Sequence, residues 1–415
     1  MKLTDYKGYV SLWVATTVSN LGSSITALAL QVMVVVLLRG NATDVGWIST
    51  ARLLPYVLLG LIAGATVDRV NRKLVIVLAD ISRGLLLSAI CLLEVSGILN
   101  MPILMSLMVL FGAMSLFHDA AYQSTVPQLV PRELLMRANA RLEQSSAVTQ
   151  TSGSAVAGTI ISLVGAPFAI LIEALSFVLS GAVMASVTYS PSQDRSQERL
   201  IDQIKQGVRW VYRHRTLSSL ALNTHAWFLF NSIVGTVFVT FALTQLGFTA
   251  FTYSLVITLT GVGSLLGSTI SSRIGQRWGI GRGMAVSRFL YCPAAIMLTV
   301  APSAHHGSLL AQTFVLVGCG QFLYGLALGI EGPIEMGYQQ AVTPSHMQGR
   351  MRATMRTINR SMVVVGAPFG GIIAATYGYR LALWIAVVGL ATVGAWFFFS
   401  PMRDAEIDKD LTDMV

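Results

Sequence analysis

The most constraining feature of the sequence is a series of apolar runs separated by short polar segments. Each run is about 20 residues long, which is the length that crosses the hydrocarbon core of a bilayer as an α-helix. The runs lie at residues 10–38, 45–66, 74–97, 102–126, 146–164, 166–188, 217–246, 251–272, 283–301, 308–333, 358–377 and 380–400. The sequence therefore predicts an all-α polytopic membrane protein with twelve transmembrane helices.

The composition suits a surface that faces lipid. Of the 415 residues, 54% are apolar and only 11% are charged, whereas a soluble domain carries about 25% charged residues. The formal charge of +9 would suit nucleic acid, but the Lys and Arg residues lie in the short segments between apolar runs. We therefore attribute the basic balance to membrane topology and expect no nucleic-acid partner.

The cationic residues also indicate how the chain is oriented. If the N-terminus is cytoplasmic, the outer segments contain only Arg39 and Arg380 of the 28 Lys and Arg residues, and nearly all the others lie in inner segments. Cytoplasmic loops of membrane proteins are enriched in Lys and Arg. Both termini are therefore predicted to be cytoplasmic.

Internal repeats indicate a duplicated fold. Three motifs of the first half recur at offsets of 216, 215 and 213 residues, and the pairs begin at Asp119 and Glu335, Met136 and Met351, and Gly153 and Gly366. A parallel repeat predicts two six-helix bundles related by a pseudo-twofold axis, with a substrate site at their interface near the bilayer midplane.

The longest polar segment, 189–218, divides the chain near its middle. Within it, apolar residues recur every three or four positions beside Lys and Arg, which is typical of an amphipathic helix lying on the inner membrane face. The predicted organisation is a bundle at 1–190, a linker with this helix at 191–215, a bundle at 216–401 and a cytoplasmic acidic tail at 402–415.

The segment Gly64–Lys73 reads G-A-T-V-D-R-V-N-R-K. It resembles the G-x-L-x-D-R-x-G-R-[RK] signature of the major facilitator superfamily, with Asn71 in place of the second glycine, and Asn also tolerates a left-handed turn. Further stretches, which begin at Ala51, Ala79, Val126, Leu135 and Glu173, resemble the drug:proton antiporter branch of macrolide-efflux proteins and enterobactin exporters. The resemblance implies a multi-pass protein of the bacterial cytoplasmic (inner) membrane that works by antiport, in multidrug efflux and antibiotic resistance.

Two positions depart from the pattern of that branch. The glycine-proline motif expected in the fifth helix reads Gly153-Ser154, and the first helix has Gly22-Ser23-Ser24 where relatives often carry an acid. Proton coupling therefore has to rest on other residues of this chain.

Charged side chains inside predicted membrane helices are candidates for function, because each costs about 2.5–3.5 kcal/mol on insertion scales. Asp80 and Arg83 stand three residues apart on one helix face and are expected to pair. Glu173 has no cation on its own helix and is the first candidate to carry a coupling proton, with Asp80 and Asp119 next. The alternative is a Glu173 satisfied by Arg52 or by a backbone group. The complete set is Arg52, Asp80, Arg83, Asp119, Glu173, Arg288, Glu331 and Glu335.

A cytoplasmic gate is predicted at the inner ends of the helices. Asp68 can accept hydrogen bonds from backbone or Arg groups in one state and lose them in another. Asp119 and Glu335 occupy equivalent repeat positions, where bonds to Arg137 and Arg352, or to helix ends across the interface of the two halves, would lock an outward-open state. Direct handling of substrate or protons is the alternative. The predicted gate comprises Asp68, Arg69, Arg72, Lys73, Asp119, Glu335, Arg137 and Arg352.

Polar stripes on the first and seventh helices, which are repeat counterparts, are predicted to line a substrate cavity. Such stripes also serve as contacts between membrane helices, and that alternative stays open. The predicted cavity residues are Asn20, Ser23, Ser24, Arg52, Asn223, Trp227, Asn231 and Tyr324.

These features predict a secondary active exporter that works by alternating access, with proton-coupled efflux of amphiphilic drugs or other small molecules. The chain has no G-x-x-x-x-G-K-[ST] loop for ATP, and its three cysteines stand singly without metal-ligand spacing. We expect no enzyme activity, cofactor or metal, and a monomer whose partners are a small-molecule substrate, protons and the lipid bilayer. Two alternatives stay open: a dedicated siderophore or metabolite exporter, and a non-transporting membrane sensor on the same scaffold.

Overall fold

The computed structural model describes residues 3–67, 70–131, 134–186, 200–303, 308–344 and 347–405, which form helices and connecting segments without a strand. The helices are α1 (Lys7–Val32), which continues through a π-helical turn to Leu37, α2 (Ala42–Val67), α3 (Arg72–Val95), α4 (Met101–Leu129), α5 (Leu135–Val164), α6 (Ala166–Ser186), α7 (Leu200–Arg213), α8 (Arg215–Thr244), α9 (Ala250–Trp278), α10 (Ile280–Thr299), α11 (Ser308–Val342), α12 (Gln348–Tyr377) and α13 (Tyr379–Phe399).

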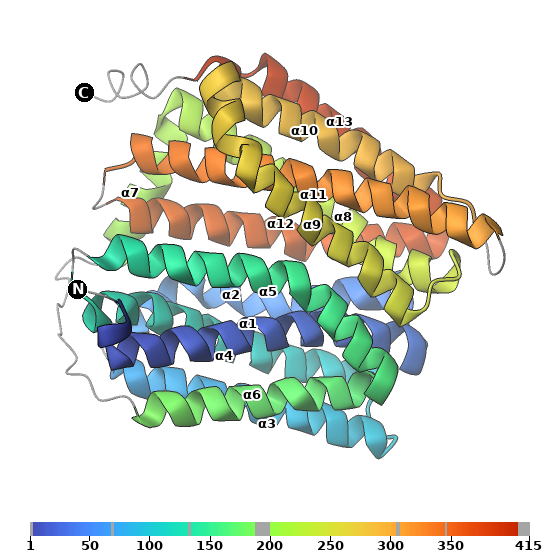
Figure 1. Ribbon diagram of the computed structural model, residues 1–415, viewed down its shortest axis with the longest axis horizontal. Helices are drawn as coiled ribbons and strands as arrows, with labels where there is room; N and C mark the ends of the chain where they lie inside the picture. The colour runs from blue at the N-terminus through green and yellow to red at the C-terminus, as the bar shows by residue number, and fades with distance from the viewer. Residues whose placement is uncertain are drawn as a thin grey trace. The chain divides into compact units, whose positions relative to one another are not determined.

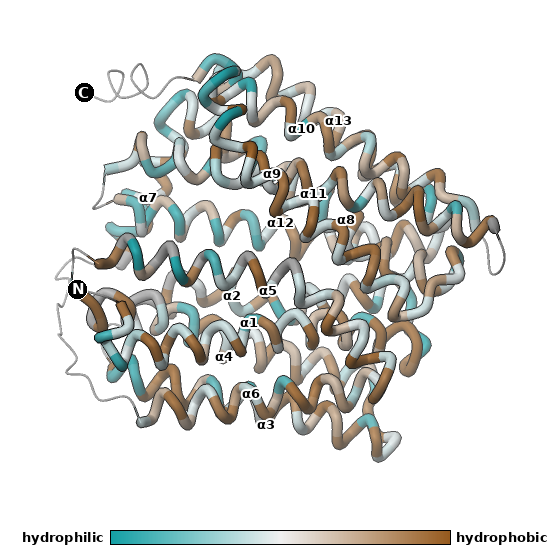
Figure 2. The backbone as a smooth tube through the Cα atoms, viewed as in Figure 1, coloured by the Kyte–Doolittle hydropathy of each residue, from teal (hydrophilic) through white to brown (hydrophobic). Residues whose placement is uncertain are grey.

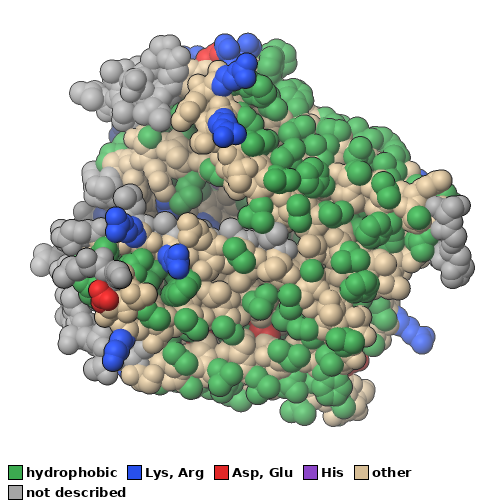
Figure 3. Space-filling model, in the orientation of Figure 1, with side chains coloured by type: hydrophobic (Ala, Val, Ile, Leu, Met, Phe, Trp, Pro, Cys, Tyr) green, Lys and Arg blue, Asp and Glu red, His purple; other side chains and the backbone are tan. Residues whose placement is uncertain are grey.

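Among the described residues, nine helices are long and apolar enough to cross a membrane: α1, α3, α4, α6, α8, α9, α11, α12 and α13. Hydrophobic residues run along most of the tube in Figure 2, and hydrophobic side chains are spread over the visible surface in Figure 3. Leu58, Leu85 and Leu92 are each more than half exposed, which is costly in water and favourable in lipid. The predicted helical membrane fold is confirmed, whereas the count of twelve spans and the side of the termini stay predictions.

The chain folds into two compact units, Met1–Leu38 with Ala51–Leu200 and Arg39–Thr50 with Ile201–Val415 (Figure 1). In the first unit α1 packs against α5 and α6, and α3 packs against α4 and α6. In the second unit α8 packs against α12 and α13, and α10 packs against α11 and α13. The helix pairs of the two units correspond one to one, as expected for a duplicated sequence.

The predicted amphipathic helix is present as α7, and it is docked onto the second unit. Val211 is fully buried, the Trp210 Nε1–H donates to Thr343 Oγ1 at 3.4 Å, and Tyr212 Oη lies 2.8 Å from His225 Nε2. Burial raises the pKa of the Tyr212 hydroxyl. Ile201 and Val208 remain exposed, which suits the predicted contact with the membrane face.

Two local expectations need correction. Asn71 does not take a left-handed turn: its φ is −68°, and its side chain accepts a hydrogen bond from the Leu74 N–H at 3.3 Å as the N-cap of α3. The predicted tail does not begin at residue 402, because Met402 and Ala405 are buried in the core of the second unit. Residues 406–415 lie outside the described part of the chain.

Four glycines let α9 and α11 cross closely in the second unit. Gly263 and Gly267 lie one turn apart on α9, as do Gly325 and Gly329 on α11. A Cβ atom at any of the four would overlap backbone atoms of the opposite helix. Small residues four apart are how membrane helices achieve such contact, so this crossing depends on glycine.

Replacing Gly325 with Ala should destabilise the protein by about 1–3 kcal/mol, because the added methyl group overpacks the crossing. Gly337 lies further along α11, and a Cβ there meets nothing within 4 Å. Gly337→Ala is therefore the matched control and should leave thermal unfolding of the detergent-solubilised protein unchanged. Equal unfolding temperatures for the two variants would contradict this account of the crossing.

Candidate functional site: buried charges in each helix unit

The first unit contains a buried ion pair between α3 side chains. Asp80 is fully buried and pairs with Arg83 one turn further along, as the i, i+3 spacing predicts. The Ser180 hydroxyl on α6 donates to Asp80 Oδ2 at 2.8 Å. The Arg83 guanidinium also lies 4.1 Å from the centre of the Phe177 ring. The pair is thus compensated from two neighbouring helices.

Glu173 on α6 is fully buried close to this pair. Among the described residues, neither of its carboxyl oxygens has a hydrogen-bond partner. The polar groups beside it are the Ser23 side chain and the Thr26 backbone of α1, and the cations Arg83 and Arg52 act on it through their charge. The predicted alternative was a Glu173 satisfied by Arg52 or by a backbone group. Arg52 is exposed and forms no ion pair with Glu173 among the described residues, whereas the Thr26 backbone lies beside the carboxyl group.

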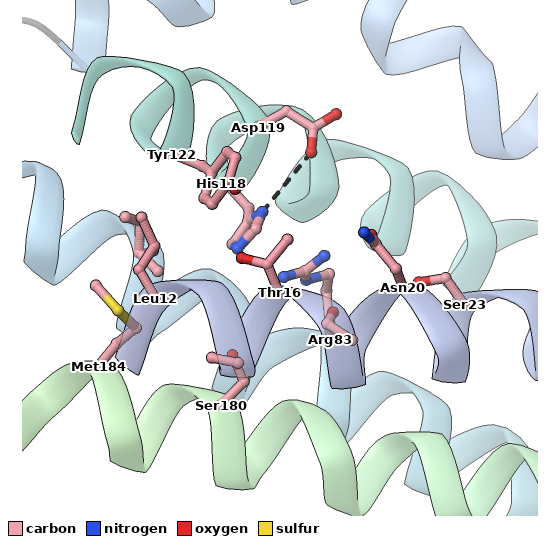
Figure 4. A pocket seen from close by; sticks show the side chains of 13 residues that line it. Leu12, Thr16, Asn20, Ser23, Arg83, His118, Asp119, Tyr122, Ser180 and Met184 are labelled. Carbon is pink, nitrogen blue, oxygen red and sulfur yellow. Dashed lines mark ion pairs between the residues drawn. The ribbon is translucent and has the colours of Figure 1, made fainter. Parts of the chain in front are cut away.

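A pocket of about 110 Å³ opens beside these charges. Its polar wall combines hydroxyl and amide groups of α1 with Arg83 of α3 and with His118 and Asp119 of α4. Figure 4 shows the ion-pair contact between His118 and Asp119. Ser23 and Arg83 both line the pocket and act on Glu173. The full lining is Leu12, Ala15, Thr16, Ser19, Asn20, Ser23, Ile76, Arg83, His118, Asp119, Tyr122, Ser180 and Met184.

His118 connects two carboxylates at this pocket. Its Nε2 atom lies 3.5 Å from Asp80 Oδ1, and its Nδ1 atom lies 3.7 Å from Asp119 Oδ1. The Tyr56 hydroxyl donates to Asp119 Oδ2 at 3.0 Å. The sequence did not predict the contact of His118 with Asp80, because it depends on how α4 is placed against α3. The contact with Asp119 could have been suspected, because the two residues are adjacent in the sequence.

The second unit contains an equivalent cluster around Arg288 of α10, which is 2% exposed. Arg288 Nη2 lies 2.5 Å from Glu331 Oε1 and 3.8 Å from Glu335 Oε2, both on α11. It also donates to Thr224 Oγ1 at 3.0 Å. The Tyr291 hydroxyl donates to Glu331 Oε2 at 2.9 Å. One buried cation therefore faces two carboxyl groups.

A family model described as "Transmembrane secretion effector" matches residues 5–414. The chain belongs to this family of the major facilitator superfamily. It is a membrane transporter, as the members of that superfamily are.

Its curated relatives are distant in sequence but similar in length. The uncharacterised major-facilitator-type transporter y4rN of Sinorhizobium fredii is 24% identical over 383 residues, 89% of each chain. Macrolide efflux protein A of Streptococcus pyogenes is 22% identical over 390 residues, 92% of each chain.

Solved structures share the fold. The nucleoside transporter NupG matches with a TM-score of 0.75 at 11% identity, covering 96% of this chain and 100% of NupG. A bacterial homologue of the human lysosomal transporter Spinster matches with a TM-score of 0.70 at 13% identity, covering 98% and 97% of the two chains. At these identities the matches concern the fold alone.

The predicted cavity residues of this transporter are dispersed. Asn20 and Ser23 line the pocket of the first unit, whereas Ser24 lies where a Cβ at Gly153 of α5 would meet it, at the α1–α5 crossing. Arg52 is exposed. The substrate-cavity role of these residues stays a prediction, and for Ser24 the contact favours helix packing.

The predicted cavity residues of the second unit join helices to one another. Asn223 is 1% exposed, and its Nδ2–H donates to Val393 O at 2.9 Å. The Tyr324 hydroxyl donates to Asn231 Oδ1 at 2.9 Å. Trp227 packs on Tyr291 with ring centres 5.2 Å apart. These contacts favour the alternative reading of the stripe on α8, in which it holds the bundle together.

The predicted gate pairs are not formed among the described residues, and the gate stays a prediction. Glu335 faces Arg288 and Asp119 faces His118, while Arg137 and Arg352 are exposed, with no ion pair to either acid among the described residues. The arginines follow α4 and α11 in sequence, but their helices turn them outward. Arg72 and Lys73 are half-buried at the start of α3, and Asp68 and Arg69 lie outside the described residues.

Removing one partner of the buried Asp80–Arg83 pair should be strongly destabilising. Asp80→Asn removes the ion-pair partner of Arg83, and breaking a buried pair costs about 3–5 kcal/mol. The double variant Asp80→Leu/Arg83→Met should recover most of that loss, because apolar groups of similar size replace both charges. Thermal unfolding in detergent measures both, and Glu94→Gln at the end of α3 is the matched carboxylate control.

A double variant no more stable than Asp80→Asn would contradict this view of the pair.

Proposed function

We propose that this transporter is a proton-coupled exporter of amphiphilic small molecules that works by alternating access. The observation that carries the proposal is Glu173, a fully buried carboxyl group without a hydrogen-bond partner among the described residues. Burying an ionised carboxylate without a partner costs several kcal/mol. The surroundings in this state therefore suit a protonated Glu173.

The position of Glu173 links its proton to the pocket. Ser23 and Arg83 line the pocket, and both act on the Glu173 carboxyl group. A substrate that engages Arg83 or Ser23 changes the field at Glu173, and a change in the charge of Glu173 alters how those two groups bind substrate. This reciprocal coupling is what an exchange of substrate for a proton requires.

The size and polarity of the pocket limit what it binds. Pockets for drug-sized ligands measure about 300–1,000 Å³, whereas this one measures about 110 Å³. It would hold a polar substituent of a larger molecule beside its hydroxyl and amide groups. An amphiphile that places its polar end here and its apolar body elsewhere fits this limit.

Export is favoured as the direction by two similarities. The family is described as a transmembrane secretion effector, and one relative at 22% identity is Macrolide efflux protein A. Neither similarity identifies the substrate of this chain, so a dedicated siderophore or metabolite exporter is the competing outcome of the test below.

Glu173→Gln should abolish proton-coupled transport, because the amide keeps the shape of a protonated carboxyl group but cannot release a proton. Inside-out vesicles, acidified within, should release protons when macrolides, tetracyclines or cationic dyes are added to the wild-type protein. The variant should release no more than protein-free vesicles, whereas Glu94→Gln should match the wild type.

Full proton release by Glu173→Gln would remove Glu173 from the coupling mechanism. Silence of the wild type towards every drug, with proton release on addition of a siderophore or another metabolite, would replace drug efflux by dedicated export.

A further inference from the structure

The charges buried around Arg288 do not balance. Arg288 is the only cation paired with Glu331 or Glu335 among the described residues. With both carboxyl groups ionised, the cluster would carry one uncompensated negative charge. Among the described residues, the other side chains in contact with Arg288 are uncharged: α8 contributes Thr224 and Trp227, and α13 contributes Phe397.

In the described part of the chain, two tyrosines are the further titratable groups in contact with the cluster. Tyr291 of α10 bonds to Glu331, and Tyr324 of α11 packs on Tyr291 with ring centres 5.3 Å apart. Phenols add no positive charge. A buried group of one cation and two carboxyl groups becomes neutral only if it binds one positive charge.

We propose that Glu335 binds a proton at its Oε2 atom, while Glu331 stays ionised as the counter-ion of Arg288. As a proton site this follows from the cluster alone. The further role of Glu335 as a second coupling site, in addition to Glu173, rests on the proposed function.

The distances to Arg288 distinguish the two carboxyl groups. Arg288 Nη2 lies 2.5 Å from Glu331 Oε1 as an ion pair, and the Tyr291 hydroxyl donates to Glu331 Oε2. For Glu335, the Gln339 Nε2–H donates to Oε1 at 2.9 Å, and the Thr224 hydroxyl reaches the same atom at 3.4 Å. A nearby cation favours the ionised form of a carboxyl group, and Arg288 is closer to Glu331 than to Glu335, at 2.5 Å against 3.8 Å.

The Oε2 atom of Glu335 is the position left for a proton. Among the described residues it accepts no hydrogen bond, and its contact with Arg288 Nη2 is long, at 3.8 Å. The Glu335 side chain is 19% exposed, against 6% for Glu331. A proton can thus reach Glu335 while the closer Arg288–Glu331 pair stays intact.

Infrared difference spectroscopy of the purified protein in detergent, recorded between alkaline and acidic pH, tests the site without a substrate. A protonated carboxyl group gives a C=O band, so the wild type should gain one band for Glu335 on acidification. Glu335→Gln should lose that band, whereas Glu94→Gln should keep it.

The charge count also predicts two less obvious spectra. Glu331→Gln should lose the same band as Glu335→Gln, because Glu335 then becomes the counter-ion of Arg288. Arg288→Met should show the bands of two protonated carboxyl groups, because no cation remains; if it does not fold, the Glu331→Gln spectrum decides.

A Glu335→Gln spectrum identical to that of the wild type would overturn the proposal. The outcome separates from that of the proposed function: a Glu335 band without proton release in vesicles leaves the proton site standing and removes the coupling. Proton release in vesicles with no Glu335 band would remove the proton site at Glu335 and leave the proposed function standing.

Discussion

A charged side chain inside a membrane helix has to be compensated within the protein, because lipid offers neither counter-ions nor hydrogen bonds. Both units meet this constraint with an arginine on equivalent helices, Arg83 on α3 and Arg288 on α10. Each guanidinium lies against an aromatic ring of the last long helix of its unit, Phe177 at 4.1 Å and Phe397 at 5.9 Å. Each unit therefore contains a buried cation that lies against an aromatic ring.

The carboxyl groups around these arginines come from different helices. Asp80 and Glu173, from α3 and α6, are buried near Arg83, whereas the two acids near Arg288 both come from α11. In each unit two buried acids thus surround a single arginine. The excess of one carboxyl group is common to the repeats even though the positions that supply it are not. In a transporter that exchanges protons, a carboxyl group in excess of the cations is the group that can bind a proton.

The sequence was sufficient for those features that depend on neighbours along the chain. Runs of apolar residues predict membrane helices, the spacing of Asp80 and Arg83 predicts their pair, and periodicity predicts α7. It was insufficient for contacts between helices, which depend on how each helix is rotated and shifted against the next. The contact of His118 with Asp80 and that of Arg288 with Glu331 arise in this way, and so does the loss of the predicted gate pairs.

The repeat alignment itself explains part of that failure. It placed Asp119 and Glu335 at equivalent positions, yet Glu335 belongs to the cluster around Arg288, whereas Asp119 is 38% exposed beside His118. Glu173 and Glu335 also differ in access. A Cβ at Gly22 of α1 would lie 2.9 Å from Glu173 Cγ, so α1 packs directly on the Glu173 side chain. Glu335, by contrast, is partly exposed. Glu173 can exchange a proton only if α1 moves away from α6, and a group whose exchange requires a helix movement is the one suited to couple protonation to the transport cycle.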